Sequence, residues 1–60
     1  MVHDILIVDN NPVILRLLKA MLERYEHRVK TADNGLKALD LMRTYRPDII
    51  ITDLIMPEKE

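Results

Sequence analysis

Ile5-Leu6-Ile7-Val8-Asp9 is the stretch that decides the fold of this chain, and Ile49-Ile50-Ile51-Thr52-Asp53 repeats its pattern. Each is a short aliphatic run followed directly by an aspartate, which is typical of a fully buried strand in a parallel sheet. If the two strands are parallel neighbours, their carboxyl ends lie roughly 5 Å apart and the two aspartates converge. Two converging carboxylates at this edge of an open α/β sheet predict a site for a divalent cation and a phosphoryl group.

Length and composition limit the chain to one small domain. It has 60 residues, no cysteine and only two aromatic residues, Tyr25 and Tyr45, so we expect an aliphatic core. A chain of this size buries only about 60% of its unfolded surface and is marginally stable alone. Because cysteine is absent, neither a disulfide nor a thiolate metal site can add stability.

Charge and hydropathy exclude several classes of function. The net charge is −1, with nine basic and ten acidic residues interspersed, and no basic stripe or aromatic platform indicates nucleic-acid binding. The first apolar run is too short for a signal peptide or a membrane span. We therefore expect a cytoplasmic protein that binds neither nucleic acid nor membrane.

Strands and helices are predicted to alternate as β-α-β-α-β. The first strand covers residues 4–9. In Asn10-Asn11-Pro12, an amide residue as N-cap and a proline at the first helical position predict a helix start. Apolar residues then recur at helical spacing over 13–25, on an arc wider than one sheet face needs. The second strand, 27–32, alternates polar and apolar residues, which is typical of an edge strand.

The same kinds of signal predict a second helix and a third strand. Asp33-Asn34-Gly35 is turn chemistry, in which Asp33 or Asn34 can cap the following helix. That helix is predicted over 36–45. Its apolar side is expected to consist of Leu36, Leu39, Met42 and Tyr45. Pro47 ends it, and Asp48 leads into the third strand, 48–53.

The connections fix the order of the strands. Right-handed crossovers place all three strands parallel. The two most hydrophobic strands, the first and the third, should be adjacent, with the more polar second strand outside. This gives the order 2-1-3, the start of the 2-1-3-4-5 flavodoxin-like, doubly wound α/β sheet. The third strand is then an open apolar edge, which folded proteins normally avoid.

Taken together, these residues resemble the receiver domain of two-component response regulators. The resemblance rests on the strand that ends at Asp9, the helix led by Pro12, Ala32-Asp33-Asn34-Gly35, and Pro47-Asp48 before Asp53-Leu54-Ile55-Met56-Pro57. It runs over residues 1–60 in order, and it covers the first half of such a domain.

The resemblance implies roles for individual residues. Asp53 would accept a phosphoryl group from a histidine kinase or a small phosphodonor, with Mg²⁺ neutralising the developing charge. Asp9 would belong to the acidic pair that holds the ion, and Asp53 and the backbone carbonyl of Ile55 would be further ligands. Such a chain is a phospho-accepting signalling module and not an enzyme.

Two departures from the family pattern bear on function. Receivers usually carry a second acid directly after the position of Asp9, and here Asn10 stands there. Its amide oxygen can still bind Mg²⁺, but weaker binding is expected because affinity follows ligand charge. The family's hydroxyl residue on the fourth strand and lysine on the fifth have no counterpart in residues 1–60, so we expect an impaired switch.

Purely structural roles stay open for several of these residues. Asp53 can cap a turn at a strand end, and Asp9 or Asn10 can be the N-cap of the first helix. His3 and His27, at the strand starts, are expected to be ordinary surface residues rather than ligands or phosphodonors. A nucleotide-binding Rossmann domain is excluded because a single glycine cannot form a glycine-rich phosphate loop.

Two apolar surfaces are expected to remain exposed: the edge at 49–51, and an extra arc of the first helix near Leu15 and Leu22. Self-association would bury them. We expect a twofold homodimer in which the third strands meet antiparallel and form a six-stranded sheet, 2-1-3-3′-1′-2′. The alternative to a signalling module is therefore a half-domain whose main property is folding and self-association.

Overall fold

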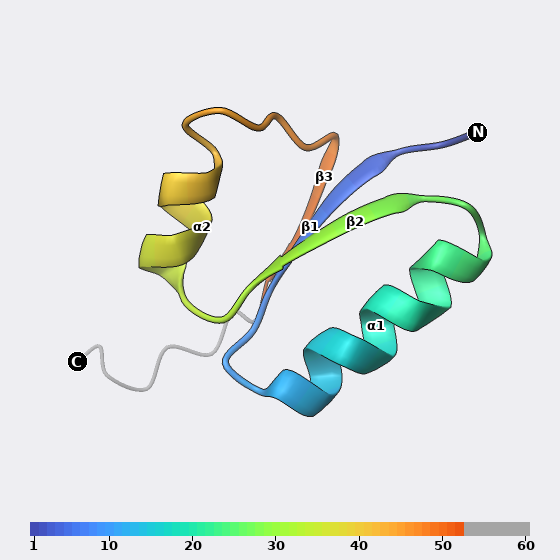
Figure 1. The fold of residues 1–60 in the computed structure, drawn as a ribbon, viewed down its shortest axis with the longest axis horizontal. Helices are drawn as coiled ribbons and strands as arrows, with labels where there is room; N and C mark the ends of the chain where they lie inside the picture. The colour runs from blue at the N-terminus through green and yellow to red at the C-terminus, as the bar shows by residue number, and fades with distance from the viewer. Residues whose placement is uncertain (53–60) are drawn as a thin grey trace.

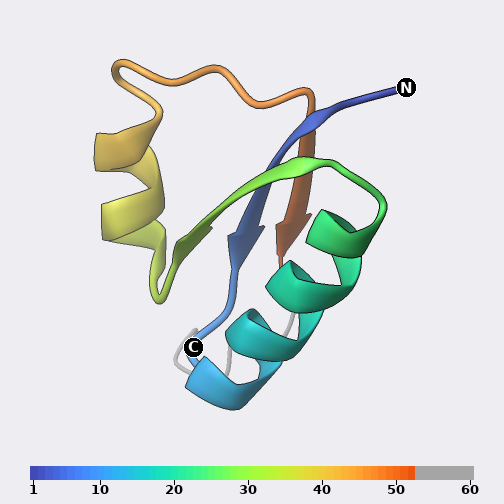
Figure 2. The same ribbon diagram turned by 45° about the vertical axis from the view of Figure 1, so that its right-hand side comes forward.

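The structure, a computed structural model, describes residues 1–52 as a three-stranded parallel sheet with one helix on each face (Figures 1 and 2). The elements are β1 (Asp4–Val8), α1 (Pro12–Arg24), β2 (Arg28–Ala32), α2 (Gly35–Leu41) and β3 (Ile49–Thr52). The sheet order is β2-β1-β3, and both pairings are parallel. The predicted element order, strand order and strand directions are confirmed. Within residues 1–52, neither helix is long and apolar enough to cross a membrane.

The core consists of two aliphatic layers, one on each face of the sheet. The layer beneath α1 contains Ile5, Ile7, Leu15 and Val29. The layer beneath α2 contains Leu6, Ala32 and Ala38. Successive side chains of a strand point to opposite faces, so the central strand β1 contributes to both layers. This is why the run Ile5-Leu6-Ile7 is apolar throughout rather than alternating.

Both helices begin with an asparagine cap. The side-chain oxygen of Asn11 accepts hydrogen bonds from the backbone N–H of Val13 (2.9 Å) and Ile14 (3.4 Å), and Pro12 is the first residue of α1. The side-chain oxygen of Asn34 accepts from the N–H of Lys37 (2.8 Å) and caps α2. Each cap satisfies helix N–H groups that have no partner within the helix. The cap of α2 is thus Asn34 and not Asp33.

The exposed apolar arc of α1 differs from the expected one. Leu15 is buried, and Leu22 packs against the same layer, so the prediction that these two leucines border the exposed arc was wrong. The apolar residues that α1 and its cap expose are Val13, Leu17, Met21 and Tyr25. Helical periodicity defines a wide arc, but only packing decides which part of it touches the sheet.

Helix α2 is shorter than predicted and turned differently. It ends at Leu41 with Met42 as its C-cap, rather than at Tyr45. Leu36 and Leu39, expected on the inner side, are exposed. The residues that face the sheet are Ala38, Leu41, Met42 and Tyr45. Met42 and Tyr45 were predicted on this side, whereas Ala38 and Leu41 lie there in place of Leu36 and Leu39. The small side chain of Ala38 lets the helix approach the sheet closely.

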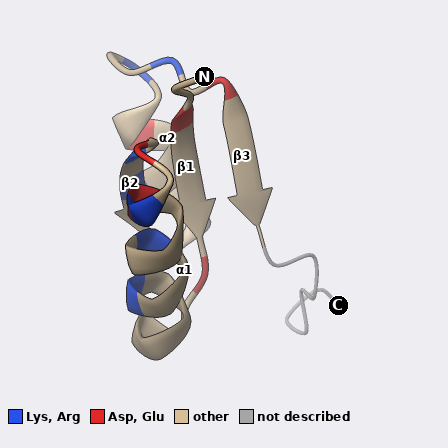
Figure 3. Ribbon diagram, turned by 90° about the vertical axis from the view of Figure 1, so that its right-hand side faces the viewer, with Lys and Arg blue, Asp and Glu red and all other residues tan. Residues whose placement is uncertain are grey.

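β3 is the least covered element of the sheet. It pairs with β1 only, and no Cα atom of α1 or α2 lies within 8 Å of a Cα atom of β3. Figure 3 shows the strand at the outer side of the sheet, apart from both helices. Ile49, Ile50 and Ile51 leave 40, 48 and 37% of their surface exposed. The predicted open apolar edge is confirmed for residues 1–52.

In the turn after α1, Glu26 has a backbone conformation that residues with a side chain rarely adopt. Glu26 has a φ angle of 69°, in the left-handed region. Its N–H donates to the carbonyl of Glu23 (2.9 Å), and the N–H of His27 donates to the carbonyl of Leu22 (3.3 Å). This pair of hydrogen bonds is the Schellman motif, which usually carries glycine at the left-handed position because glycine has no Cβ.

Replacing Glu26 with glycine is therefore expected to raise the free energy of unfolding by about 1 kcal/mol, since a left-handed residue with a Cβ costs about 1–2 kcal/mol. Urea unfolding followed by circular dichroism measures the change. Glu26→Ala is the matched control: it removes the charge but keeps the Cβ, so no comparable gain is expected. Equal stability of the glycine and alanine variants would show that backbone strain is not the cause.

Candidate functional site

The carboxyl ends of β1 and β3 lie side by side, as predicted. The register pairs Val8 with Thr52, so the chain leaves both strands at one edge of the sheet. Neighbouring strands lie roughly 5 Å apart, so Val8 and Thr52, the last residues of β1 and β3, are neighbours at this edge. Of the predicted site residues, Asp9 and Asn10 are described, whereas Asp53 and Ile55 lie outside the described residues.

Asp9 directly follows β1 and is half-buried. Its N–H donates to the carbonyl of Ala32 (3.1 Å), which continues the hydrogen bonding to β2 beyond the strand. Its Oδ1 accepts from the N–H of Asn11 (2.9 Å). This contact closes an Asx turn and holds the carboxylate at the sheet edge. No lysine or arginine of residues 1–52 forms an ion pair with Asp9, so its charge stays available for a cation.

The two neighbouring asparagines have different roles. Asn11 is the N-cap of α1, so the alternative that Asp9 or Asn10 caps this helix was wrong. Asn10 is exposed, and its side chain makes no hydrogen bond to another residue of the described part. Within residues 1–52, no hydrogen bond therefore occupies its amide oxygen.

The side-chain oxygens of Asp9 and Asn10 are of the type that binds a hard divalent cation, but two residues do not complete a site. Carboxylate and amide oxygens are ligands that Mg²⁺ accepts, and Mg²⁺ keeps several waters, so few protein ligands suffice. Within residues 1–52 no group of three or more His, Cys, Asp or Glu side chains could hold a metal ion. A site that used Asp9 and Asn10 would need its other ligands from residues beyond Thr52.

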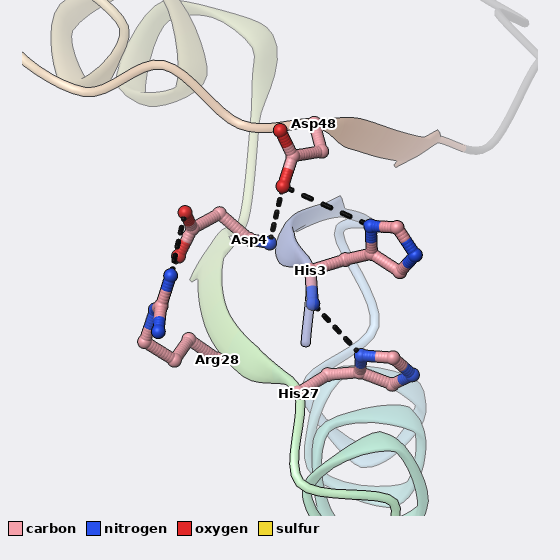
Figure 4. A network of polar contacts seen from close by, with 5 residues as sticks. All are labelled: His3, Asp4, His27, Arg28 and Asp48. Carbon is pink, nitrogen blue, oxygen red and sulfur yellow. Dashed lines mark hydrogen bonds and ion pairs between the residues drawn. The ribbon is translucent and has the colours of Figure 1, made fainter. Parts of the chain in front are cut away.

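A polar cluster that we did not predict lies at the opposite, amino-terminal edge of the sheet. The amino-edge cluster consists of His3, Asp4, His27, Arg28 and Asp48 (Figure 4). Arg28 donates from Nε and Nη2 to the two carboxylate oxygens of Asp4 (2.7 and 3.1 Å). These hydrogen bonds hold the pKa of the Asp4 carboxyl below its ordinary value. The register of the two parallel strands could have revealed this cluster before the structure was known. Pairing Asp4 with Arg28 also brings His3, the residue before Asp4, beside His27.

Comparison with known proteins agrees with this arrangement. Residues 5–60 match the response regulator receiver domain. The chain belongs to this family. Protein PilH of Pseudomonas aeruginosa is 43% identical over 53 residues, and the polar-differentiation response regulator DivK of Brucella anthropi is 36% identical over 58. Chemotaxis protein CheY of Halobacterium salinarum is 30% identical over 60 residues.

The three alignments cover 88, 97 and 100% of this receiver chain, but only 44, 47 and 50% of the relatives. The chain thus spans about half the length of the curated relatives it matches. Receiver domains are normally phospho-accepting modules of two-component signalling rather than enzymes; they are typically paired with histidine kinases and commonly use Mg²⁺.

Proposed function

We propose that this receiver domain accepts a phosphoryl group on Asp53, with Mg²⁺ held by Asp9, Asn10, Asp53 and the backbone carbonyl of Ile55. The observation that carries the proposal is the parallel pairing of Val8 with Thr52, which brings the chain after both strands to one edge of the sheet. The receiver match supports it because the matched residues, 5–60, include Asp53 and Ile55. A histidine kinase or a small phosphodonor is the partner, and a cytoplasmic location belongs to the same proposal.

The proposed reaction is a phosphoryl transfer to a carboxylate. A carboxylate oxygen of Asp53 attacks phosphorus, an O–P bond forms, and the N–P bond of a phosphohistidine donor breaks, leaving the imidazole to take up a proton. When bound, Mg²⁺ neutralises charge on the phosphoryl oxygens. Asp9 holds the ion with the carboxylate that Asn11 orients. Asn10 adds a ligand but no charge, so we infer weaker Mg²⁺ binding than with an acid at this position.

Phosphorylation within these 60 residues is proposed to be impaired. The family's hydroxyl residue and lysine contact the transferred group and relay its presence, and neither has a counterpart in the chain. A peptide of residues 1–60 alone would therefore keep the acceptor carboxylate and one side of the proposed metal site without the contacts of those two residues.

The test is treatment of the chain with acetyl phosphate and Mg²⁺, followed by intact-mass measurement. Wild type should gain the mass of one phosphoryl group, and the gain should disappear with a chelator because the developing charge is then uncompensated. Asp53→Asn is the matched control and should gain nothing. A gain that persists in Asp53→Asn would assign the acceptor elsewhere, and no gain in wild type would refute the proposal.

A second property is favoured by the exposure of β3. We infer that two copies of the chain form a symmetric homodimer through this strand, with the sheet order 2-1-3-3′-1′-2′ and an antiparallel central pair. Among residues 1–52, the outer edge of β3 pairs with no strand, its three isoleucines are half-exposed, and no Cα atom of α1 or α2 lies within 8 Å of a β3 Cα atom; these observations support the dimer. The two acidic edges would then lie at opposite ends of the sheet. For the 60 residues alone, self-association is the alternative to a signalling role.

A further inference from the structure

Asn11 joins the carboxylate of Asp9 to the first turn of α1. Its backbone N–H donates to Oδ1 of Asp9 (2.9 Å). Its side-chain oxygen accepts from the N–H groups of Val13 (2.9 Å) and Ile14 (3.4 Å), and its carbonyl accepts from the N–H of Leu15 (3.1 Å). The helix therefore holds Asn11 on one side, and Asn11 holds the carboxylate on the other.

These contacts tie Asp9 to two different elements of the fold. Through Asn11, its side chain is connected to Leu15, which belongs to the buried layer beneath α1. Through its own N–H, its main chain is bonded to the carbonyl of Ala32 at the end of β2 (3.1 Å). A carboxylate held from both sides is already in place before an ion binds, so little conformational freedom is lost on binding.

The contact with Asn11 also distinguishes the two carboxylate oxygens of Asp9. Oδ1 accepts the Asn11 N–H, whereas Oδ2 makes no hydrogen bond or ion pair with another residue of 1–52. A carboxylate that presents one open oxygen suits a small cation that keeps several waters, as Mg²⁺ does.

Asn34 provides a comparison within the same chain. It caps α2 as Asn11 caps α1, because its side-chain oxygen accepts from the N–H of Lys37 (2.8 Å). Both asparagines are exposed, and both have an extended backbone. The carboxylate beside Asn34 is that of Asp33, which accepts from its side-chain amide (3.3 Å). The two caps are therefore equivalent as helix starts, but within residues 1–52 it is Asn11 that is bonded to Asp9.

We propose that Asn11 is a positioning residue for the Asp9 carboxylate, through which cation binding at Asp9 and capping of α1 reinforce each other. The inference rests on the Mg²⁺ site of the proposed function. Loss of the cap frees the backbone of Asn11, so the carboxylate is no longer held and has to be ordered when an ion binds. Because coupling between two sites is reciprocal, an ion at Asp9 should also strengthen the hydrogen bonds of the cap.

The test is the Mg²⁺ dissociation constant, measured by isothermal titration calorimetry at a temperature where circular dichroism shows each protein to be folded. Asn11→Ala removes the cap and should raise the constant by about tenfold, the lower end of the range for residues that support a metal ligand. Serine also caps helices, so Asn11→Ser should stay within about twofold of wild type. Asn34→Ala, the matched control, removes the cap of α2 and should leave the constant unchanged.

The possible outcomes separate this inference from the proposed function. Equal effects of the two alanine variants would show that cap loss acts through general stability, and would overturn the positioning role. An unchanged constant in Asn11→Ala, or one in Asn11→Ser as high as in Asn11→Ala, would overturn it as well. In each of these cases wild type still binds Mg²⁺ and the proposed metal site stands. Absence of Mg²⁺ binding by wild type would refute the metal site itself, and the positioning role with it.

Amide hydrogen exchange gives a second readout, at the cap rather than at the ion. In wild type, saturating Mg²⁺ should slow exchange of the Val13 and Ile14 amides, which Asn11 binds, by up to about tenfold, the same factor, because the coupling is reciprocal. The Lys37 amide, bound by Asn34, should exchange at the same rate with and without Mg²⁺. Exchange of Val13 and Ile14 that does not respond to saturating Mg²⁺ would show that cap and carboxylate are not coupled.

Discussion

Replacing Leu6 with alanine is expected to lower the free energy of unfolding by about 3–5 kcal/mol. Leu6 is fully buried at the centre of the middle strand, where it packs against Ala32 and Ala38 beneath α2. Truncation removes the transfer free energy of the side chain and leaves a cavity between two small residues that cannot fill it. A domain of this size has about 3–9 kcal/mol of stability in total, so the variant should be largely unfolded.

Urea or thermal unfolding of the variant, followed by circular dichroism, measures this loss. The matched control is Leu36→Ala, the same truncation on α2, where the side chain is 80% exposed. Its expected effect is within about 0.5 kcal/mol of wild type. If Leu36→Ala were as destabilising as Leu6→Ala, α2 would present its Leu36 side to the sheet, contrary to the packing described here.

The sequence was sufficient for the sheet because its signals there are local and strong. The run Ile5-Leu6-Ile7 has no polar residue to expose, which suits a strand covered on both faces, and β1 is central. The equally apolar run Ile49-Ile50-Ile51 lies at the edge, so this pattern identifies a strand but not its place in the sheet. The amide-proline pair before α1 likewise fixes the helix start, because the cap and the proline act on the first turn alone. The parallel direction of the strands then follows from the helical crossovers, and the order 2-1-3 follows from the more polar character of the second strand.

The orientation of the helices could not be predicted in the same way. In α1, Leu15 and Leu22 share one stripe while Val13, Leu17 and Met21 share another, and both stripes have helical spacing. The number of apolar residues therefore exceeds what one sheet face can cover, and the pattern alone does not choose between the stripes. Contact with the sheet makes the choice, and it is a property of the tertiary structure.

The candidate functional residues also divide into those that a local sequence signal identifies and those that only the tertiary structure brings together. Asp9 was predicted as a site residue because it directly follows a strand signal, and Asn10 because it stands where the receiver family usually has a second acid; the structure places both after the carboxyl end of β1. The contact between His3 and His27 was missed because it joins residues 24 positions apart and needs the register of two strands to be known. The pairing of Asn11 with Asp9 was also not foreseen, since two adjacent asparagines offered equivalent caps.

Replacing Ile50 with lysine is expected to weaken the proposed β3 dimer by roughly 10- to 100-fold. Ile50 is 48% exposed in the single chain, so about half of its surface remains to be buried when a second copy pairs with β3. Burying a whole isoleucine contributes about 1.5–3 kcal/mol, so half of it contributes about 0.8–1.5 kcal/mol per copy. Twofold symmetry doubles the loss to about 1.5–3 kcal/mol, and each 1.4 kcal/mol is a factor of ten.

Sedimentation equilibrium over a range of micromolar concentrations measures the dimer dissociation constant of wild type and Ile50→Lys. The matched control is Thr31→Lys, which adds the same charge to an exposed position of the other edge strand, β2, and should leave association unchanged. Circular dichroism of both variants establishes that each is folded at the concentrations used. A folded wild type that remains monomeric throughout would refute the dimer, and equal weakening by both lysines would show that net charge, rather than the β3 edge, controls association.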